Sequence, residues 1–421
     1  MLGPDVARYV DAAIDYAIEN NRLIGAVVLV AIDGEIVYQR AAGMADREAR
    51  SPMRENAIFR LASVTKPMVS ATALSLVEEG LLSLTGPVTR WLPTFKPKTI
   101  DGQTPEITLR HLLTHTAGLD YGFDDQRPAY RTASVSTGLE QPGLASSEAI
   151  ARLSAMPLVF KPGTNWLYSL AIDVVGAIIE RASGASLAEV VKQKITAPLD
   201  MKDTGFSVTD AARLVTAYRD ALPHPKLISD GDVVNNWLGP ITFSPSRVFD
   251  ASSYQSGGAG MVGTVADFLR FLEAIRTGGH PILGDEGHRL IMKPALPSGV
   301  SVGEAGWDHG MAGLVLKDNS RARGFHGNGT WRGGGAYGHH WFVDPKSQLS
   351  FVCFTNTAFE GCDGPAALNI RDALYRGLSE TLGERTLEPQ SIDKKREGKP
   401  NEKSQQNKWL KPKSARMQLE N

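Results

Sequence analysis

The stretch from Phe59 to Gly80 constrains the fold most, because its apolar side chains go nearly all the way round a predicted helix. Such a helix is enclosed by protein rather than exposed on a surface. The pattern predicts a start near Ser63 and a stop at Gly80, and Pro67 is tolerated so close to a helix start. Ser63 and Lys66 are three residues apart, so they share one face of the first turn.

A hydroxyl and an amine in the first turn of an enclosed helix indicate nucleophilic catalysis. A serine hydroxyl needs an adjacent base, and a lysine with an ordinary pKa is protonated at neutral pH. Burial and the positive helix end both favour the uncharged amine of Lys66, and backbone N–H groups at that end suit an oxyanion. The S-x-x-K tetrad alone is weak support, because about one or two occur by chance in a chain of this length. A second tetrad, 391–394, lies in a charged tail.

Composition excludes several classes of function. The chain has 421 residues, of which 42% are hydrophobic and 22% charged, as in an ordinary globular protein, and its net charge of −1 argues against nucleic-acid or anionic-membrane partners. The N-terminus has acidic residues and no apolar core, so we expect no signal peptide, no membrane span and a cytoplasmic protein. A mature form that had lost its leader would read the same way. Cys353 and Cys362 form no disulfide framework, although one bond between them stays open.

Secondary-structure signals place strands at both ends of the chain. An amphipathic helix is predicted over 4–20, followed by two strands joined at Asp33-Gly34. Further strands are predicted at 311–316, 338–343 and 349–356, and then a helix over 366–382. The part between is mostly helical, with long loops predicted at 120–147 and 219–260.

This order predicts an α/β (α+β) fold, in which helices flank one antiparallel sheet built from both ends of the chain and an all-helical region is inserted. We expect a discontinuous sheet domain, 1–58 plus 301–386, and a mainly helical domain, 59–300. Residues 387–421 are rich in Lys, Gln, Asn and Glu, which predicts a basic, disordered tail. A basic docking segment is the alternative for this tail.

Five segments carry a specific resemblance, in the order of the serine β-lactamase-like and penicillin-binding-protein-like hydrolases. They are S-V-T-K (63–66), H-L-L-T-H-T-A-G-L (111–119), K-P-G-T-N-W-L-Y-S (161–169), G-G-A-G-M-V-G-T-V-A-D-F (257–268) and Y-G-H-H-W-F-V-D-P (337–345). About residues 5–385 most resemble the class C β-lactamase-related esterases, the family VIII carboxylesterases. The resemblance implies the β-lactamase/transpeptidase-like fold.

The resemblance also implies roles for three residues. Ser63 is acylated, Lys66 activates it, and Tyr168 of the Y-S-x motif shares the proton traffic. We expect a tyrosine whose pKa is lowered beside Lys66 and which passes a proton to the leaving alkoxide. Taken alone, Tyr168 would be a packed core aromatic, and which of Lys66 and Tyr168 is the formal base stays open.

Two departures from the lactamase pattern bear on the substrate. Leu170 occupies the asparagine position of Y-x-N, and no K-T-G or K-S-G triplet precedes the strand at 338, so the cation for a penicillin carboxylate is missing. Both favour a neutral ester. Related esterases have W-x-G or W-G-G there; counting back from Y-G-H-H-W puts their Trp on Gly333, whereas Trp331-Arg332-Gly333 is shifted by two. The first register makes the amides of Ser63 and Ala336 the oxyanion donors.

The same register predicts which residues border the substrate. Trp331 and Arg332 are expected at the pocket rim, next to Gly334 and Gly335. Aromatic residues of the long loops are candidates for an acyl pocket, with packing as the alternative reading; they are Tyr121, Tyr130, Trp237 and Tyr254.

Competing motifs lack their structural context. The G-x-S-x-G match at 299–303 needs a strand before it and a helix after it, but Pro and Gly residues there indicate a loop. His111 and His115 lack the glutamate of H-E-x-x-H and a third ligand, so structural hydrogen bonding explains them better than a metal. The glycines at 333–335 do not form a phosphate loop. We therefore expect neither a metal nor a cofactor.

The sequence thus predicts a serine hydrolase that cleaves carboxylic esters, with short acyl chains, through an acyl-Ser63 intermediate. The alternatives within enzymes are hydrolysis of a β-lactam or a D-amino-acid amide or peptide, and acyl transfer to an alcohol. The alternative from another class is a β-lactam-binding sensor that is acylated without turnover. The expected partner is a small ester, and the sequence does not indicate an oligomeric state.

Overall fold

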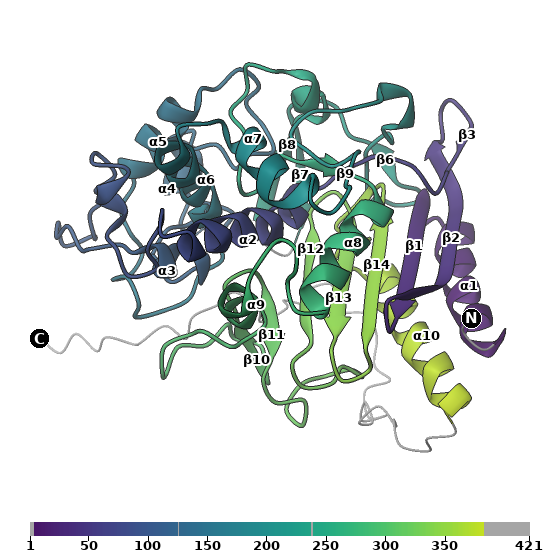
Figure 1. Cartoon of the computed structure of the whole chain (residues 1–421). Coiled ribbons are helices and arrows are strands. Elements are labelled where there is room, and N and C mark those ends of the chain that lie inside the picture. Colours follow the sequence, from purple (N-terminus) through teal and green to yellow (C-terminus); the bar gives the residue numbers. More distant parts are fainter. Residues whose placement is uncertain (1–3, 125, 237–238, 383–421) are drawn as a thin grey trace, which may run out of the picture.

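The computed structural model describes residues 4–124, 126–236 and 239–382, so the predicted tail at 387–421 lies outside the described residues. Its centre is an eight-stranded antiparallel sheet (Figure 1). In spatial order the strands are β10 (Trp307–His309), β11 (Leu314–Leu316), β12 (Trp331–Gly335), β13 (His339–Asp344), β14 (Leu349–Thr355), β1 (Gly25–Ile32), β2 (Glu35–Asp46) and β3 (Ser51–Pro52).

The sheet joins the two ends of the chain, as predicted. Strand β1 pairs with β14 in antiparallel register, with Val28 opposite Cys353. On its other side β1 forms the expected hairpin with β2, and the turn residues Asp33 and Gly34 have φ values of 50° and 85°. Positive φ at both central positions is the two-residue turn that matches the twist of paired strands.

Helices cover both faces of this sheet. Helices α1 (Pro4–Glu19) and α10 (Pro365–Leu382) pack against each other, and their apolar side chains bury one face together with Val28, Phe342 and Phe351. The other face is covered by α8 (Val265–Arg276), which crosses β14 and β1 (Figure 1). This helix belongs to the segment predicted as helical, so the middle of the chain contributes to the sheet layer as well. The proposed boundaries at 58 and 300 remain a prediction.

The enclosed helix predicted after Phe59 is α2 (Thr65–Glu78), and twelve consecutive residues from Thr65 to Leu76 are buried. It packs against α6, α7 and α9. The other helices of the middle segment are α3 (Leu109–Leu113), α4 (Ala129–Thr132), α5 (Ser146–Ser154), α6 (Ala171–Ser183), α7 (Leu187–Val191) and α9 (Asp285–Ile291). Single turns of other helix types lie at η1 (Ala62–Val64), η2 (Val88–Arg90), η3 (Lys192–Thr196), η4 (Ala211–Arg213) and η5 (Pro245–Phe249).

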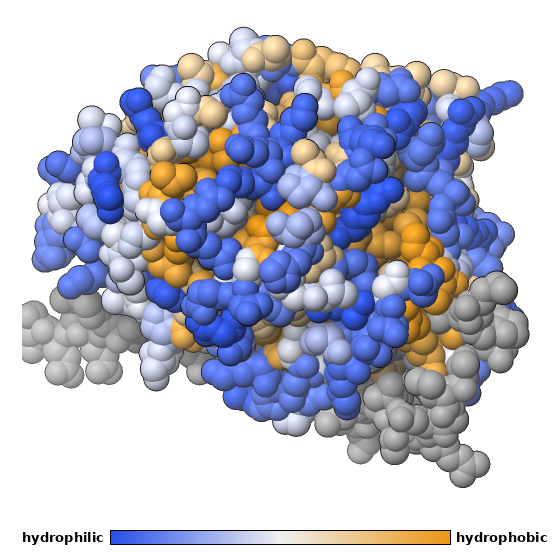
Figure 2. Space-filling model, in the orientation of Figure 1, coloured by the Kyte–Doolittle hydropathy of each residue, from blue (hydrophilic) through white to orange (hydrophobic). Residues whose placement is uncertain are grey.

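The predicted long loops contain short elements. Helix α4 lies within 120–147, and an isolated hairpin lies within 219–260. The strands outside the main sheet are β4 (Phe59–Arg60) with β9 (Val262–Gly263), β7 (Asp232–Asn236) with β8 (Gly239–Phe243), and β15 (Thr357–Ala358) with β5 (Tyr218–Arg219) and β6 (Lys226–Leu227). Figure 2 shows hydrophobic residues in patches among hydrophilic ones on the face in view.

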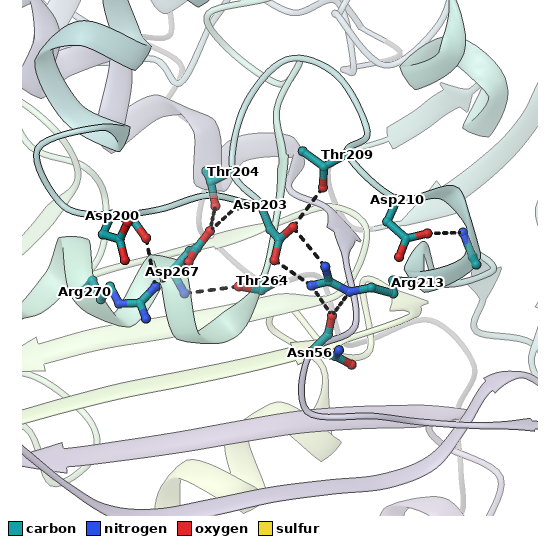
Figure 3. A network of polar contacts seen from close by, with 11 residues as sticks. Asn56, Asp200, Asp203, Thr204, Thr209, Asp210, Arg213, Thr264, Asp267 and Arg270 are labelled. Atoms are coloured by element: carbon teal, nitrogen blue, oxygen red, sulfur yellow. Dashed lines mark hydrogen bonds and ion pairs between the residues drawn. The ribbon is translucent and has the colours of Figure 1, made fainter.

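A polar network fastens the loop after α7 to the start of α8 (Figure 3). The buried Asp267 carboxylate accepts hydrogen bonds from the Asp203 backbone N–H at 2.9 Å and the Thr204 hydroxyl at 3.0 Å, and it pairs with Arg270. Arg213 forms a second arm, because its guanidinium binds both Asp203 oxygens and the Asn56 carbonyl. The network therefore holds this loop against strand β9, which pairs with the strand that leads to Ser63.

Replacing Asp267 by alanine is expected to lower the free energy of unfolding by about 2–4 kcal/mol. The substitution removes the acceptor of the half-buried Asp203 N–H and of the buried Thr204 hydroxyl, and an unsatisfied buried group costs about 1–3 kcal/mol. Urea or thermal unfolding measures the change. An Asp267→Asn variant keeps an acceptor oxygen in place, so it should lose clearly less. Equal losses in both variants would show that the hydrogen bonds do not carry the effect.

Candidate active site

Ser63 is held at the entry to α2 by contacts from another part of the chain. It lies in the single turn Ala62–Val64, which runs directly into α2, and it is half-buried. The Leu61 N–H donates to the carbonyl of Met261, and the Met261 N–H donates to the Thr65 hydroxyl. Ala62 has a φ of 45°, a left-handed conformation that an alanine adopts only when its surroundings impose it. The position of Ser63 is therefore fixed from both sides.

Lys66 lies one turn further, as predicted, and its amine faces the serine. Its Nζ is 3.0 Å from Ser63 Oγ and donates a hydrogen bond to the Gly258 carbonyl at 2.8 Å. Burial lowers the pKa of Lys66 to about 7, although the charge of Asp173 acts in the opposite direction. A large fraction of Lys66 is therefore uncharged at neutral pH, as a base for Ser63 requires.

Tyr168 comes from the loop before α6. With Ser63 and Lys66 it forms a cluster of three side chains, the Ser63 group. Its side chain is hydrogen-bonded to Ser63, and Lys66 Nζ lies 4.7 Å from the centre of its ring. The structure thus brings the three predicted residues together across about a hundred positions of sequence. Burial raises the pKa of Tyr168 above its ordinary value of 10.0, and the hydrogen bond with Ser63 only partly opposes this. The predicted lowering of this pKa is therefore wrong, because desolvation outweighs the nearby amine.

An acidic residue that sequence reasoning missed lies behind Lys66. Asp173, in the first turn of α6, is buried and accepts a hydrogen bond from the Ser256 hydroxyl at 2.6 Å. Burial raises its pKa, whereas Ser256 and the charge of Lys66 lower it. Gly258 fits between the two groups, since a Cβ there would lie 2.4 Å from Asp173 Oδ2. The G-G-A-G segment was a signal for this packing, but its spacing did not reveal Asp173 as the partner.

Two aromatic residues border the amine. Lys66 Nζ lies 5.4 Å from the centre of the Tyr121 ring, which stacks on Phe123 at 4.6 Å. Tyr121 is thus the one loop aromatic among the candidates that reaches the Ser63 group within the described residues. Tyr254 is buried elsewhere, where its hydroxyl bonds to Ser136, and Trp237 lies outside the described residues.

Strand β12 ends beside Ser63, where the second oxyanion donor was predicted. A Cβ on Gly335 would lie 2.5 Å from the Leu61 carbonyl oxygen, so only glycine permits this approach. Ala336 follows directly, and its carbonyl accepts the Phe359 N–H at 3.2 Å. Gly334 is half-buried, and a Cβ there would lie 2.8 Å from Cys362 Sγ. Because these glycines have no Cβ, the end of strand β12 can lie close to Ser63.

Three of the predicted pocket residues lie in the interior instead. Trp331 is fully buried on the face of β12 that packs under α8, with its ring 4.7 Å from that of Trp341. Arg332 points to the opposite face, where it pairs with Glu304 at 2.6 Å. Tyr130 is buried and donates its hydroxyl to the Pro157 carbonyl. The prediction that these residues line a pocket is therefore wrong, because their side chains are buried in contacts with other parts of the protein.

The histidines of 111–119 make structural hydrogen bonds, as predicted. His111 caps α3 reciprocally with Thr108, and His115 accepts a hydrogen bond from the Ser169 N–H. Within the ranges that the structure covers, no group of three or more His, Cys, Asp or Glu residues is arranged to hold a metal ion. Cys353 and Cys362 are both free thiols. None of the described helices combines the length and the apolar character needed to cross a membrane.

Comparisons with known proteins agree with this geometry. Esterase EstB of Burkholderia gladioli is 45% identical over 377 residues, which cover 88% of this chain and 95% of that protein. Lovastatin esterase of Penicillium rubens is 28% identical over 81% of this chain and 91% of its own length. The solved structure of "EstCE1, a hydrolase with promiscuous acyltransferase activity", is 40% identical and superimposes with a TM-score of 0.85 over 88% of this chain and 98% of that one.

The predicted resemblance and the β-lactamase/transpeptidase-like fold are therefore confirmed over nearly all of the described chain. The sequence model named Beta-lactamase matches residues 10–375. This chain belongs to the Beta-lactamase family.

Proposed function

We propose that this protein is a serine carboxylesterase that cleaves esters through an acyl intermediate on Ser63. The observation that carries the proposal is the Lys66 amine, which is 3.0 Å from the serine hydroxyl and has a pKa of about 7. A base with this pKa is matched to work at neutral pH. The relatives named esterases or hydrolases, at 45% and 40% identity, support the same reaction.

The acylation step uses the three grouped side chains in order. Ser63 Oγ attacks the ester carbonyl while its proton passes to Lys66 Nζ, and the backbone N–H groups of Ser63 and Ala336 stabilise the oxyanion. Because burial raises the pKa of Tyr168, its phenol stays protonated and can donate to the departing alkoxide. Lys66 then returns a proton to Tyr168, and the alcohol leaves. In deacylation, water replaces the alcohol and the same proton transfers run in reverse.

The residues around the serine favour a neutral substrate. Leu170 is buried, so no amide side chain is present at that position to bind a β-lactam or peptide amide. In the register counted back from Y-G-H-H-W, Gly333 stands where a lysine would bind a carboxylate, and the neighbouring guanidinium of Arg332 is already paired with Glu304. An anionic substrate would thus lose its water without gaining a free cation. A small, uncharged ester avoids this cost.

A substrate panel tests the proposal. p-Nitrophenyl butyrate, nitrocefin and a D-amino-acid amide are compared at the same pH, and the ester is expected to have the largest kcat/KM. A preference for nitrocefin or the amide would overturn the ester assignment. The same ester with an added alcohol measures acyl transfer as a fraction of turnover.

The site of acylation is tested separately. A fluorophosphonate is expected to add one label, which peptide mass spectrometry locates on Ser63. A label on another residue would contradict the proposal. An acyl-protein that persists after exposure to the ester would instead identify a sensor that does not turn over.

Replacing Asp173 by asparagine is expected to move the acid limb of the pH–rate profile to lower pH. In the wild type kcat/KM should rise with pH through about 7, because Lys66 acts without its proton. The Asp173 charge favours the ammonium form, so its removal lowers the pKa of Lys66. Asparagine keeps the acceptor for Ser256. We would measure kcat/KM for an uncharged ester from about pH 5 to about pH 9, a range that extends to both sides of the pKa of Lys66.

Asp267→Asn is the matched control, since it neutralises another buried carboxylate that lies in the network of Figure 3 rather than against Lys66. Its acid limb should stay in place. A shift of equal size in both variants would show that overall charge, not contact with Lys66, sets the profile.

A further inference from the structure

His115 lies directly beyond the short helix α3 and holds an unusual backbone conformation. Its φ is 54°, in the left-handed region that non-glycine residues seldom adopt, and its side chain is buried. Thr114, the residue before it, is the C-cap of α3, so this turn redirects His115 away from the helix axis and toward Ser63, Lys66 and Tyr168. Such a conformation persists only where contacts hold it.

The contacts of His115 are concentrated on Tyr168 and its two neighbours in sequence. The Leu167 N–H donates to the His115 carbonyl at 3.0 Å, and the Ser169 N–H donates to His115 Nδ1 at 3.2 Å. Between these two bonds, the imidazole contacts the Tyr168 ring, with centres 4.8 Å apart and ring planes tilted by 39°. One residue thus binds the backbone on both sides of Tyr168 and contacts its side chain.

On the side away from Tyr168, the His115 imidazole packs against His309. The His309 ring meets it edge-on at 5.2 Å, and His309 Nδ1 is bonded to the Gly310 carbonyl at 2.6 Å. The Trp166 ring lies 5.8 Å from His309. His115 is therefore placed between the Tyr168 ring on one side and His309 on the other, where rotation of the imidazole would break its bond with Ser169.

The bond from Ser169 also defines the protonation of His115. A backbone N–H can donate only to a nitrogen without a proton, so His115 Nδ1 must be the unprotonated one. Burial lowers the pKa of His115 well below its ordinary value, and the charges of His309 and Lys66 add to this. The ring is thus a neutral acceptor throughout the range in which Lys66 is deprotonated.

We propose that His115 is a positioning residue for ester hydrolysis: it holds Tyr168 at the angle from which its hydroxyl reaches Ser63. The inference rests on the proposed function, because it assigns His115 a role through Tyr168. A displacement of about 1 Å at a reacting group can cost about a hundredfold in rate. The alternative is a histidine that only packs behind α3, which would affect stability but would not act through Tyr168.

A double-mutant cycle separates these possibilities. The four proteins are the wild type, His115→Gly, Tyr168→Phe and the double variant, each assayed for kcat and KM with p-nitrophenyl butyrate. Glycine accepts a φ of 54° without strain and removes the imidazole. We expect His115→Gly to lower kcat about 10–100-fold, with KM changed less than about threefold. In the Tyr168→Phe background the same change should lower kcat less than about threefold, because the hydroxyl to be positioned is already gone.

A rescue variant and a matched control complete the test. His115→Asn should recover most of the lost kcat, because asparagine tolerates the left-handed region and its amide oxygen can accept the Ser169 N–H. His111→Ala changes the histidine inside α3 that takes part in the capping box with Thr108, so it should leave kcat unchanged even where it lowers the melting temperature. If melting curves show that His115→Gly is unfolded at the assay temperature, the cycle is run at a lower temperature at which all four proteins are folded.

The outcomes distinguish the inference from the proposed function. Equal kcat losses from His115→Gly with and without the Tyr168 hydroxyl would overturn the positioning role while leaving the esterase assignment intact. Full activity in His115→Gly would do the same. Full activity in Tyr168→Phe would overturn both the role of Tyr168 and the inference built on it.

Discussion

A Ser63→Ala variant is expected to hydrolyse p-nitrophenyl butyrate about 10⁴–10⁶-fold more slowly than the wild type. Removing the nucleophile of a serine hydrolase leaves only the contribution of oxyanion donors and binding, and losses of about 10⁶ in kcat have been typical of such replacements. Ser63 is half-buried at the start of α2, and its side chain contacts the catalytic group rather than the core. The melting temperature should therefore change little.

Ser70→Ala is the matched control for this experiment. Ser70 lies one turn beyond Lys66 on the same helix, and its buried hydroxyl has no hydrogen-bond partner among the described residues. We expect wild-type kcat and unchanged or slightly higher stability, because removing an unsatisfied hydroxyl costs nothing. Residual turnover above about 1% in Ser63→Ala would place the nucleophile elsewhere, and the serine of the G-x-S-x-G match, Ser301, would be examined next.

Local patterns predicted the parts of the site that are close together in sequence. The spacing of Ser63 and Lys66 on one helical turn follows from helix geometry, and an apolar sequence all round a helix implies enclosure. Burial of the helix then explains the lowered pKa of Lys66. The hairpin at Asp33-Gly34 was equally readable, because two adjacent positive φ angles need those residue types.

Contacts between distant segments were not readable in this way. The resemblance to a known family indicated Tyr168, but the role of Asp173 depends on the packing of Gly258 between it and Lys66. Strand β12 contains three successive glycines, so the alternation that shows which side chains face inward is absent. Trp331 and Arg332 therefore looked like pocket residues, although the pleat sends them into opposite buried faces.

The pKa of Tyr168 shows how competing effects are decided by tertiary structure. The sequence suggested that a neighbouring amine would stabilise the phenolate. With a pKa of about 7, the Lys66 amine is uncharged in the alkaline range where a tyrosine titrates, so it does not stabilise the phenolate, and burial of the ring is the dominant effect. Both shifts have one cause, the enclosure of the group. They leave Lys66 as the base and Tyr168 as the proton donor in the proposed mechanism.

Replacing Lys66 by methionine is expected to lower kcat for the same ester by about 10³–10⁴-fold, near the upper range for loss of a general base. Methionine has a similar length and no ionisable group, so it fills the space without replacing the base. Ester hydrolysis is measured from about pH 5 to about pH 9, so that the range extends to both sides of the pKa of Lys66 in the wild type. The residual activity should lack the rise through about pH 7 that deprotonation of Lys66 produces in the wild type.

The same substitution should remove a pH dependence of stability, which separates titration of the base from a general loss of the fold. The pKa of Lys66 falls from 10.5 to about 7 on folding, so between these pH values the unfolded chain binds more protons than the folded one. Stability linked to Lys66 therefore rises with pH across that window and is lowest below it. Lys66→Met removes this dependence, and it also removes the donor to the buried Gly258 carbonyl, which costs about 1–3 kcal/mol at every pH. If the difference in stability between the variant and the wild type is the same at all pH values from about 7 to 10.5, Lys66 does not titrate with a lowered pKa, and the assignment of its amine as the base fails.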